Sequence, residues 1–443
     1  MRRRIKVTEK NNIDQDALQQ LVMSSSPTPS HVSEDFALYS VNFFLKSYVL
    51  LPRSSENRRS FMDFLYPIYL KASPASPLIP ALTAVASLLL EAWSLLKPDA
   101  PLSFSRTQYA KAMTSLRKSL QNPDKVGDDV LTASLLLDMY ESVRSFLWSE
   151  PFQAAHKTGV IAMIEQRRQS PVSDMASQNL LLGARSQVVG RALETSSTLP
   201  PNIRSWISTA AEVPRTAGLE LDELNIALAD LQVSASRMGE PDVEIEEGLA
   251  WEVLHDLYEL DQRYVTWASA VPEGWIVDSV AGPECIPLSI KECGLYQDHC
   301  HLYQSIFVAH TFNSHRASRI KLQLAILTCL SHMPMTLNGV ASSAAQDTIQ
   351  KLADDICASV PYHLGDRTGF KRIDDMTVQY PHMASESVAS ADHIVAAAAM
   401  GGWALAERLG GLLRLRVPLR EGQRQWIAGQ LRRIVAIYVT QPK

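Results

Sequence analysis

Two cysteines and two histidines lie close together in the sequence and are the first candidates for metal chemistry. Cys293, His299, Cys300 and His301 fall within nine residues. Zinc sites usually take thiolate and imidazole ligands in close pairs such as C-x2-C or H-x3-H, because a short turn must aim both ligands at one ion. Here the two histidines are two residues apart at an expected helix start, which directs them to different sides. We therefore predict a loop thiol and surface histidines rather than a metal site.

Two pairs of adjacent aspartates raise the question of magnesium–diphosphate chemistry. Such chemistry needs carboxylates that repeat on a helix face around an apolar cavity, together with a second set of ligands. Asp128-Asp129 is typical of a helix start, where carboxylates meet the positive end of the helix dipole. Asp374-Asp375 lies in an expected loop without a further acid nearby. Neither pair predicts a metal site.

The sequence contains no other catalytic pattern. Gly401-Gly402 and Gly410-Gly411 flank an expected helix, but no strand precedes them and their spacing fits no phosphate loop. These small residues are expected instead to allow close contact between helices. No nucleophile-elbow sequence occurs. We therefore predict no catalytic residue, no metal ion and no cofactor, and a protein that is not an enzyme.

Basic residues gather near both ends of the chain. The C-terminal set is Arg408, Arg414, Arg416, Arg420, Arg424, Arg432 and Arg433. We interpret it as a solvated helical face, and the alternative is an anion or nucleic-acid patch. Arg2-Arg3-Arg4, with Lys6 and Lys10, is typical of an import signal or of contacts to a DNA backbone.

Helices must position all of these residues. From about Glu34 onward, apolar residues recur at spacings of three and four, as in Ala37, Val41, Phe44 and Tyr48. The pattern predicts an all-α fold, an irregular multi-helix array with a long central helix over 295–330 and a final helix pair over 393–415 and 421–438. We expect irregular segments over 272–292 and 360–391. Residues 1–33 are polar and Ser/Pro-rich, which predicts a disordered tail before a helical domain over 34–443, with a soft division near 196–245.

Composition narrows the class of protein. The net charge of -5 argues against broad affinity for nucleic acid or acidic membranes. Five cysteines in 443 residues fit a reducing compartment. The sequence shows no signal peptide and no apolar run of about 18 residues that could span a membrane. We expect an intracellular, soluble protein.

Four segments carry a further pattern, in this order. They are the helix from Tyr109 through Leu116 and Leu120 with the LLL-x2-YE run that ends at Glu141; the H-x2-G run from His156 with the basic end Arg167-Arg168; the run Phe312-Asn313-Ser314-His315-Arg316-Ala317-Ser318-Arg319-Ile320; and the Trp/Leu-rich pair over 393–434. Over roughly residues 36–440, they resemble the regulatory (middle homology) domain of fungal binuclear zinc-cluster transcription factors. The third segment is similar to the W-N-x-Y-R-x2-R-I pattern of that family, with both aromatic residues changed.

Four polar residues stand on otherwise apolar helices in these segments: Glu141, His156, Arg316 and Arg319. Buried polar groups are usually hydrogen-bonded within the protein, so we interpret them first as satisfied core or capping groups. Ligand contacts are the alternative.

The sequence departs from the family in one respect, because it has no cysteine before Cys285. The six-cysteine cluster that gives the family zinc binding and sequence-specific DNA recognition therefore does not carry over, and direct DNA binding is not expected. The resemblance still implies a nuclear regulator of gene expression, often of a secondary-metabolite gene cluster, with the cytoplasm as the other location. Its helical body would sense a small-molecule effector or form a homodimer or a heterodimer with a zinc-cluster relative. The alternative is a helical small-molecule-binding protein or enzyme recruited to a biosynthetic pathway.

Overall fold

The structure is a computed structural model that describes residues 32–49, 62–93, 103–121, 126–148, 155–167, 174–206, 216–238, 247–333, 335–373, 375–386 and 388–438. Nearly all of the predicted tail over 1–33 lies outside these ranges. Asp374 of the second aspartate pair also lies outside them.

Helices account for most of the described chain, and the predicted all-α, irregular multi-helix array is confirmed. The first group is α2 (Val32–Ser47), α3 (Leu65–Lys71), α4 (Leu78–Trp93), α5 (Ser103–Leu120), α6 (Asp128–Trp148), α7 (Ala155–Arg167) and α8 (Met175–Thr195). The second group is α9 (Ala217–Met238), α10 (Glu247–Ala270), α12 (Ile306–Leu330), α13 (Met335–Ala358), α16 (Gly402–Arg414) and α17 (Gln423–Tyr438). Short elements between them are η2 (Ile203–Trp206), η3 (Glu273–Trp275), β1 (Asp278–Ala281), α11 (Leu288–Glu292), β2 (His299–Leu302), α14 (Val360–Leu364), α15 (Ala391–Ala396) and the π-helical turn η4 (Ala397–Gly401).

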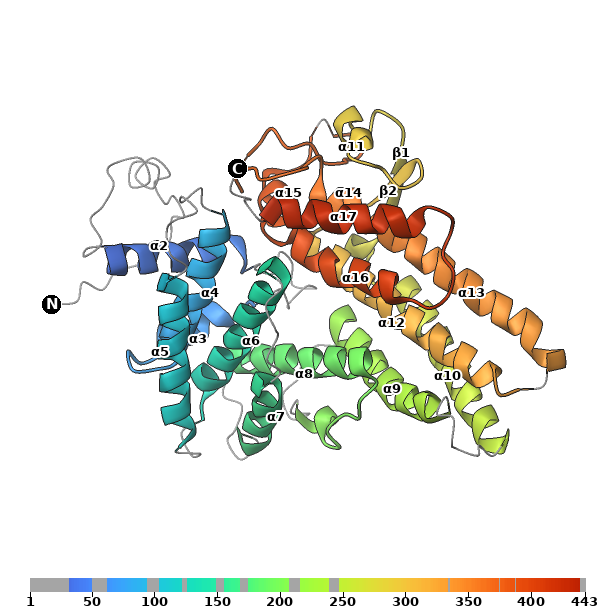
Figure 1. The fold of residues 1–443 in the computed structure, drawn as a ribbon, viewed down its shortest axis with the longest axis horizontal. Helices are drawn as coiled ribbons and strands as arrows, with labels where there is room; N and C mark the ends of the chain where they lie inside the picture. Colours follow the sequence, from blue (N-terminus) through green and yellow to red (C-terminus); the bar gives the residue numbers. More distant parts are fainter. Residues whose placement is uncertain are drawn as a thin grey trace.

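The two groups of helices lie side by side (Figure 1). The blue and teal helices α2 to α7 form the left part, and the orange and red helices α12 to α17 form much of the right part, with α8 and α9 running between them. Phe146 of α6 packs edge-on against Trp403 of α16, with ring centroids 5.1 Å apart, and so joins the two parts directly. The division near 196–245 stays a prediction.

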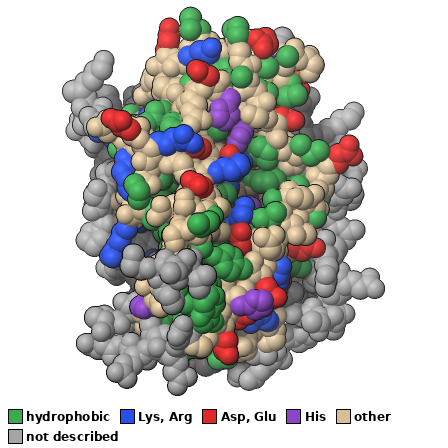
Figure 2. Space-filling model, turned by 90° about the vertical axis from the view of Figure 1, so that its right-hand side faces the viewer, with side chains coloured by type: hydrophobic (Ala, Val, Ile, Leu, Met, Phe, Trp, Pro, Cys, Tyr) green, Lys and Arg blue, Asp and Glu red, His purple; other side chains and the backbone are tan. Residues whose placement is uncertain are grey.

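Two helices of the first group are buried on nearly all sides, as their apolar sequences predict. Every residue of α4 from Leu82 to Leu90 is buried. The helix packs against α2, α5 and α6. α6 begins at Asp128, as predicted, and its residues Val130 to Leu137 are buried. Within the described ranges, no helix is long and apolar enough to cross a membrane. On the face shown in Figure 2, acidic, basic and hydrophobic side chains are interspersed.

The long central helix is shorter at its start than predicted. α12 begins at Ile306, where Ser305 accepts a hydrogen bond from the backbone N–H of Val308 at 3.2 Å and so caps the helix. The preceding residues form β2 instead, which pairs antiparallel with β1 in the register Val280 opposite Cys300. The prediction of a helix from 295 was therefore wrong, because a two-stranded ribbon depends on a partner strand that local periodicity does not reveal.

Close approach of backbones shapes the C-terminal part. α15, η4 and α16 form one continuous helical segment, and a β-carbon placed on Gly401 would lie only 2.0 Å from the carbonyl oxygen of His363 in α14. The hydroxyl of Tyr438, at the end of α17, accepts from the N–H of Gly402 at 3.1 Å and donates to the carbonyl of Ala398 at 3.0 Å. Glycines here permit the close helix–helix contact that the sequence predicts.

We expect the substitution Gly401→Ala to lower the free energy of unfolding by about 3 kcal/mol, because the added methyl group meets rigid backbone. Gly429→Ala is the matched control, since nothing lies within 4 Å of a β-carbon at that position of α17. It should be neutral or stabilise by about 0.5–1 kcal/mol, because alanine has the higher helix propensity. Urea unfolding followed by circular dichroism measures both, and equal effects of the two substitutions would contradict this packing.

Candidate functional site

The candidate site lies along α12, which is buried on almost every side. α12 packs against α9, α10, α13 and α16. Its N-terminal half nevertheless carries a run of polar side chains that are less than a tenth exposed, namely Asn313, His315, Arg316 and Ser318. Each polar group must find a partner within the protein, because an unpaired buried polar group is costly.

Arg316 donates only to neutral acceptors. Its Nη1 donates to the hydroxyl of Tyr303 at 2.6 Å and to Oδ1 of Asn313 at 2.8 Å. Its Nη2 lies 3.3 Å from Nδ1 of His301. Its guanidinium carbon lies 5.8 Å from the ring centroid of Phe312 and 5.8 Å from that of Tyr303. No ion pair of Arg316 occurs in the part of the chain that the structure describes, so this cation is held by hydrogen bonds and aromatic rings.

The acceptors around Arg316 belong to a wider network between α12 and α14. Asn313 donates from Nδ2 to the hydroxyl of Ser359 at 2.9 Å, and the same nitrogen lies 3.5 Å from Nε2 of His363. Tyr362 donates to the backbone carbonyl of Tyr303 at 2.6 Å. The guanidinium of Arg316 is thus linked through Asn313 and Tyr303 to polar groups of α14 and of Ser359 just before it.

Burial keeps the nearby histidines neutral. It lowers the pKa of His301 to about 4, with a further contribution from Arg316, and the pKa of His363 to about 3. Burial also lowers the pKa of His315 to about 4; this ring stacks on Trp267 and its Nε2 lies 2.9 Å from the carbonyl of Tyr264. A neutral His301 can accept a hydrogen bond from Arg316, whereas an imidazolium would repel it.

Arg319, three residues further along α12, has a charged partner. It forms a two-point ion pair with Asp261 of α10, with Nε–Oδ1 at 2.7 Å and Nη2–Oδ2 at 2.9 Å. Gln323 donates to the same carboxylate at 2.9 Å. These three side chains hold α10 to α12. The charge of the Arg319 guanidinium is therefore balanced by a carboxylate within the protein.

The structure places the remaining two polar residues of the sequence pattern in the first group of helices. Glu141 of α6 accepts a hydrogen bond from the hydroxyl of Tyr109 in α5 at 2.6 Å, and the Tyr109 ring stacks on Tyr140. His156 lies in α7, and its side chain is outside the described residues. Glu141 and the backbone of His156 thus belong to α6 and α7, whereas Arg316 and Arg319 belong to α12.

The cysteine–histidine cluster is arranged differently from the prediction. His299 and His301 lie two apart on strand β2, so they share one face, with ring centroids 5.7 Å apart, whereas Cys300 points to the other face and packs with Cys285. The prediction that the histidines diverge was wrong because it assumed a helix. Among the described residues, no group of three or more His, Cys, Asp or Glu side chains could hold a metal ion.

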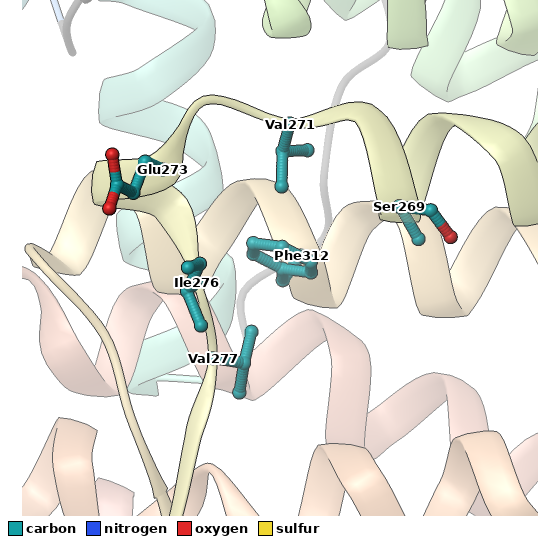
Figure 3. Close-up of a pocket in the computed structure, with 7 residues that line it drawn as sticks. Ser269, Val271, Glu273, Ile276, Val277 and Phe312 are labelled. Atoms are coloured by element: carbon teal, nitrogen blue, oxygen red, sulfur yellow. The ribbon is translucent and has the colours of Figure 1, made fainter.

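A surface depression opens beside the buried network. It has a volume of about 480 Å³ and is lined by Ala268, Ser269, Val271, Glu273, Ile276, Val277 and Phe312. Figure 3 shows the side chains of Val271, Ile276 and Val277 gathered around Phe312. Five of the seven lining residues are apolar, and Ser269 and Glu273 are polar.

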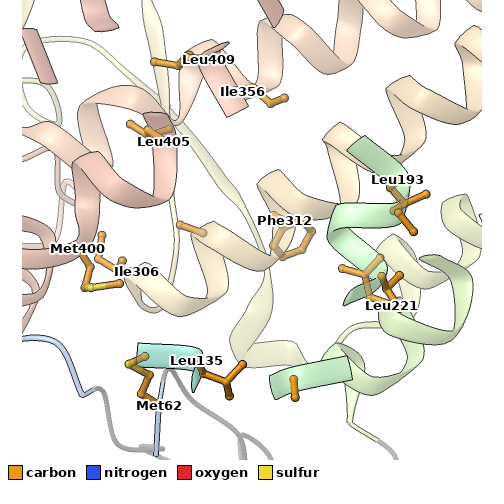
Figure 4. Packing of buried hydrophobic residues seen from close by; sticks show 14 of the residues in the cluster. Met62, Leu135, Leu193, Leu221, Ile306, Phe312, Ile356, Met400, Leu405 and Leu409 are labelled. Carbon is orange, nitrogen blue, oxygen red and sulfur yellow. The ribbon is translucent and has the colours of Figure 1, made fainter. Parts of the chain in front are cut away.

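Phe312 connects this depression to the interior. Its ring packs edge-on against Trp267, with centroids 5.6 Å apart, and Arg316 lies close to the ring as well. Phe312 also belongs to the continuous hydrophobic core, in which Leu193 and Leu221 approach it from other helices (Figure 4). A ligand in the depression would therefore rest on a residue that contacts both the core and the Arg316 network.

Of the residues that line the depression, sequence patterns had singled out Phe312 alone. Val271, Ile276 and Val277 lie in and beside the segment that we expected to be irregular. Their one signal is an apolar pair, Ile276-Val277, within a Pro/Gly-rich stretch, and Ile276 is 55% exposed.

The comparisons with known proteins point to regulation. The chain is similar to the transcription factor dbaG of Emericella nidulans, with 24% identity over 346 residues, which cover 77% of each protein. No family model matches the chain, and no solved structure matches it. The chain is thus a distant relative of a fungal transcription factor.

We expect Asp261→Ala to lower the free energy of unfolding by about 3 kcal/mol, because it leaves Arg319, whose side chain is only 20% exposed, without its carboxylate. Asp230→Ala is the matched control: Asp230 pairs with Arg204 at 3.2 Å, and both side chains are more than half exposed. It should cost less than about 1 kcal/mol. Chemical denaturation of both variants tests this, and a small effect at Asp261 would show that the pair does not hold α10 to α12.

Stability should fall as the pH is lowered from 6.5 toward 5.5. The pKa values of His301, His315 and His363 in the folded protein lie below the value of about 6.5 in an unfolded chain. Above that pH both states are neutral; below it the unfolded state binds protons first and is favoured, by up to about 1.4 kcal/mol per pH unit for each histidine. Urea unfolding at pH 7.5, 6.5 and 5.5 measures the slope, and a flat profile would contradict neutral burial.

Proposed function

We propose that this protein is a nuclear regulator of gene expression whose helical body responds to a small-molecule effector. The similarity to a transcription factor over 77% of both chains carries the proposal. A secondary-metabolite gene cluster is the proposed target.

The depression on Phe312 is the proposed effector site. Its lining suits a ligand with a mainly apolar or aromatic body, which would cover Val271, Ile276 and Val277. Ser269 and Glu273 at its edge would take a hydrogen-bonding group of the ligand. A ligand that displaced the Phe312 ring would alter the surroundings of Arg316, which hydrogen-bonds to neutral groups within the described part of the chain. A change in the packing of β2 and α14 against α12 is the proposed output.

Specific DNA contact is proposed to come from a partner, namely a zinc-cluster relative that pairs with this chain. The net charge of -5 gives the body little affinity of its own for a polyanion. A second copy of this sequence would not supply a zinc cluster, so the proposed partner is a different protein that carries one.

Tethering tests this function without knowledge of the natural target. The full chain is fused to a heterologous DNA-binding domain, and transcription of a reporter gene is measured in a fungal host. We expect reporter output to change by several-fold relative to the DNA-binding domain alone, and Val271→Glu to alter that output because it places a charge in the apolar depression. Val340→Glu, at a position 87% exposed, is the control and should behave as the unmodified chain. A fusion that leaves transcription unchanged in every growth condition would count against a regulatory role.

A further inference from the structure

Helix α10 has one long exposed face. Its main contacts are with α9 and α12, beside which it lies at the lower right of Figure 1. Trp267 donates to the backbone carbonyl of Ala217 in α9, and Asp261 accepts from Arg319 of α12, so these two directions are covered. The remaining face of the helix is exposed along its described length.

Three large apolar side chains follow this exposed face at an interval of seven residues. Trp251 is 43% exposed, Tyr258 42% and Val265 36%. Seven residues make nearly two turns of an α-helix, so the three side chains stand in one row. Apolar side chains scattered singly over a surface are ordinary, whereas a row with this spacing is typical of contact with a second helix. These three residues are called the α10 row below.

Acidic residues border the α10 row on one side. Glu252, Asp256 and Glu259 are exposed and follow one another at spacings of four and three, which puts them on a common strip of the helix. Within the described ranges, no ion pair joins Glu252 or Asp256 to another residue. Glu259 lies 3.4 Å from Nε2 of His255, but these side chains are 68% and 71% exposed, so water screens the contact. Arg263 is the only lysine or arginine in α10, and the border therefore carries unbalanced negative charge.

A second copy of this chain fits the face poorly. In a twofold antiparallel pair of α10 helices centred on Tyr258, the same border of both helices meets, which sets carboxylates against carboxylates. In a parallel pair, the acidic border of one copy would have to meet the opposite border of the other. Leu254 and Asp261 lie on that opposite border and are buried, with Asp261 held by Arg319 of α12. A nucleic acid is a polyanion, and the same acidic residues would repel it.

We infer that the α10 row and its acidic border form a docking surface for a helix of a partner protein, one with apolar residues at seven-residue spacing and lysines or arginines beside them. The apolar residues of the partner would cover Trp251, Tyr258 and Val265, and its cations would pair with the acidic border. The inference rests on the proposed function in one respect, because it gives the proposed zinc-cluster partner a place of contact.

The docking surface ends at the depression on Phe312. Ser269, which lines the depression, lies four residues after Val265 on the same side of α10. A partner helix on the α10 row would therefore lie next to the proposed effector, so that occupation of the depression would change one end of the docking surface.

Two designed peptides are the probes. Each is a fluorescent helical peptide of three seven-residue repeats, with leucine at the two apolar positions of every repeat. One carries lysine and the other glutamate at the positions beside the leucines. Fluorescence anisotropy with the full chain, at concentrations at which the peptides are monomeric, should show saturable binding of the lysine peptide. The glutamate peptide should bind at least about tenfold more weakly.

A substitution within the row tests where the lysine peptide binds. Tyr258→Ala should weaken its binding by at least about tenfold, because aromatic residues at the centre of an interface carry much of the free energy of binding. Leu120→Ala is the matched control, since Leu120 at the end of α5 is 41% exposed and Tyr258 is 42% exposed. This control should bind as the unmodified chain does. Circular dichroism of both variants should show unchanged helix content, because both positions lie on the surface.

Charge reversal tests the acidic border. The double variant Glu252→Lys, Asp256→Lys should prefer the glutamate peptide to the lysine peptide, because its border is then basic. Glu284→Lys, Glu292→Lys reverses the same number of charges at exposed positions outside α10. This second double variant should keep the preference for the lysine peptide.

Several results would overturn the inference. Absence of saturable binding of the lysine peptide would do so, as would equal binding of the two peptides or equal effects of the Tyr258 and Leu120 substitutions. A dimer of the full chain in size-exclusion chromatography with light scattering, dissociated by Tyr258→Ala, would show that a second copy covers the row instead. The reporter experiment supplies DNA binding through the fused domain, so failure of the regulatory role and failure of the docking surface remain distinguishable.

Discussion

The fold depends on one constraint: a 25-residue helix, α12, lies in the interior and carries polar side chains that must be satisfied there. The cost of leaving a guanidinium unpaired in the core would exceed the gain from most single apolar contacts. Neighbouring elements therefore have to present acceptors at fixed heights along α12. α10 supplies Asp261, β2 supplies His301, and α14 with the residue before it supplies His363 and Ser359.

Arg316 and Arg319 of α12 meet this constraint by different means. Toward α10, a charged pair with a second donor fixes the contact, and its loss would leave a bare charge. Toward β2 and α14, neutral groups share one cation, and burial keeps the histidines in the accepting form. The second arrangement is the one that a change in Phe312 would reach, since this ring lies between the depression and Arg316. The Arg316 network is thus the part of the core that lies nearest the surface depression.

The C-terminal segment shows how small residues serve two purposes. Gly401 and Gly402 let backbone and the Tyr438 ring approach the helical segment closely, which fixes α14 and α17 against it. Gly410 and Gly411 lie further along α16. Their missing side chains leave room there for the side chain of Arg414. The same sequence pattern therefore allows close packing at one end of α16 and leaves room for a side chain of the same helix at the other.

The sequence by itself determined the helical class and the start of α6 at Asp128, because these follow from local periodicity and helix-end chemistry. It also selected Arg316 and Arg319 as polar positions on an apolar helix, but not their partners. Asp261 and Tyr303 come from separate elements, and β2 forms only because residues 278–281 pair with it. Tertiary structure decided these features, because burial and pairing depend on which distant segments meet.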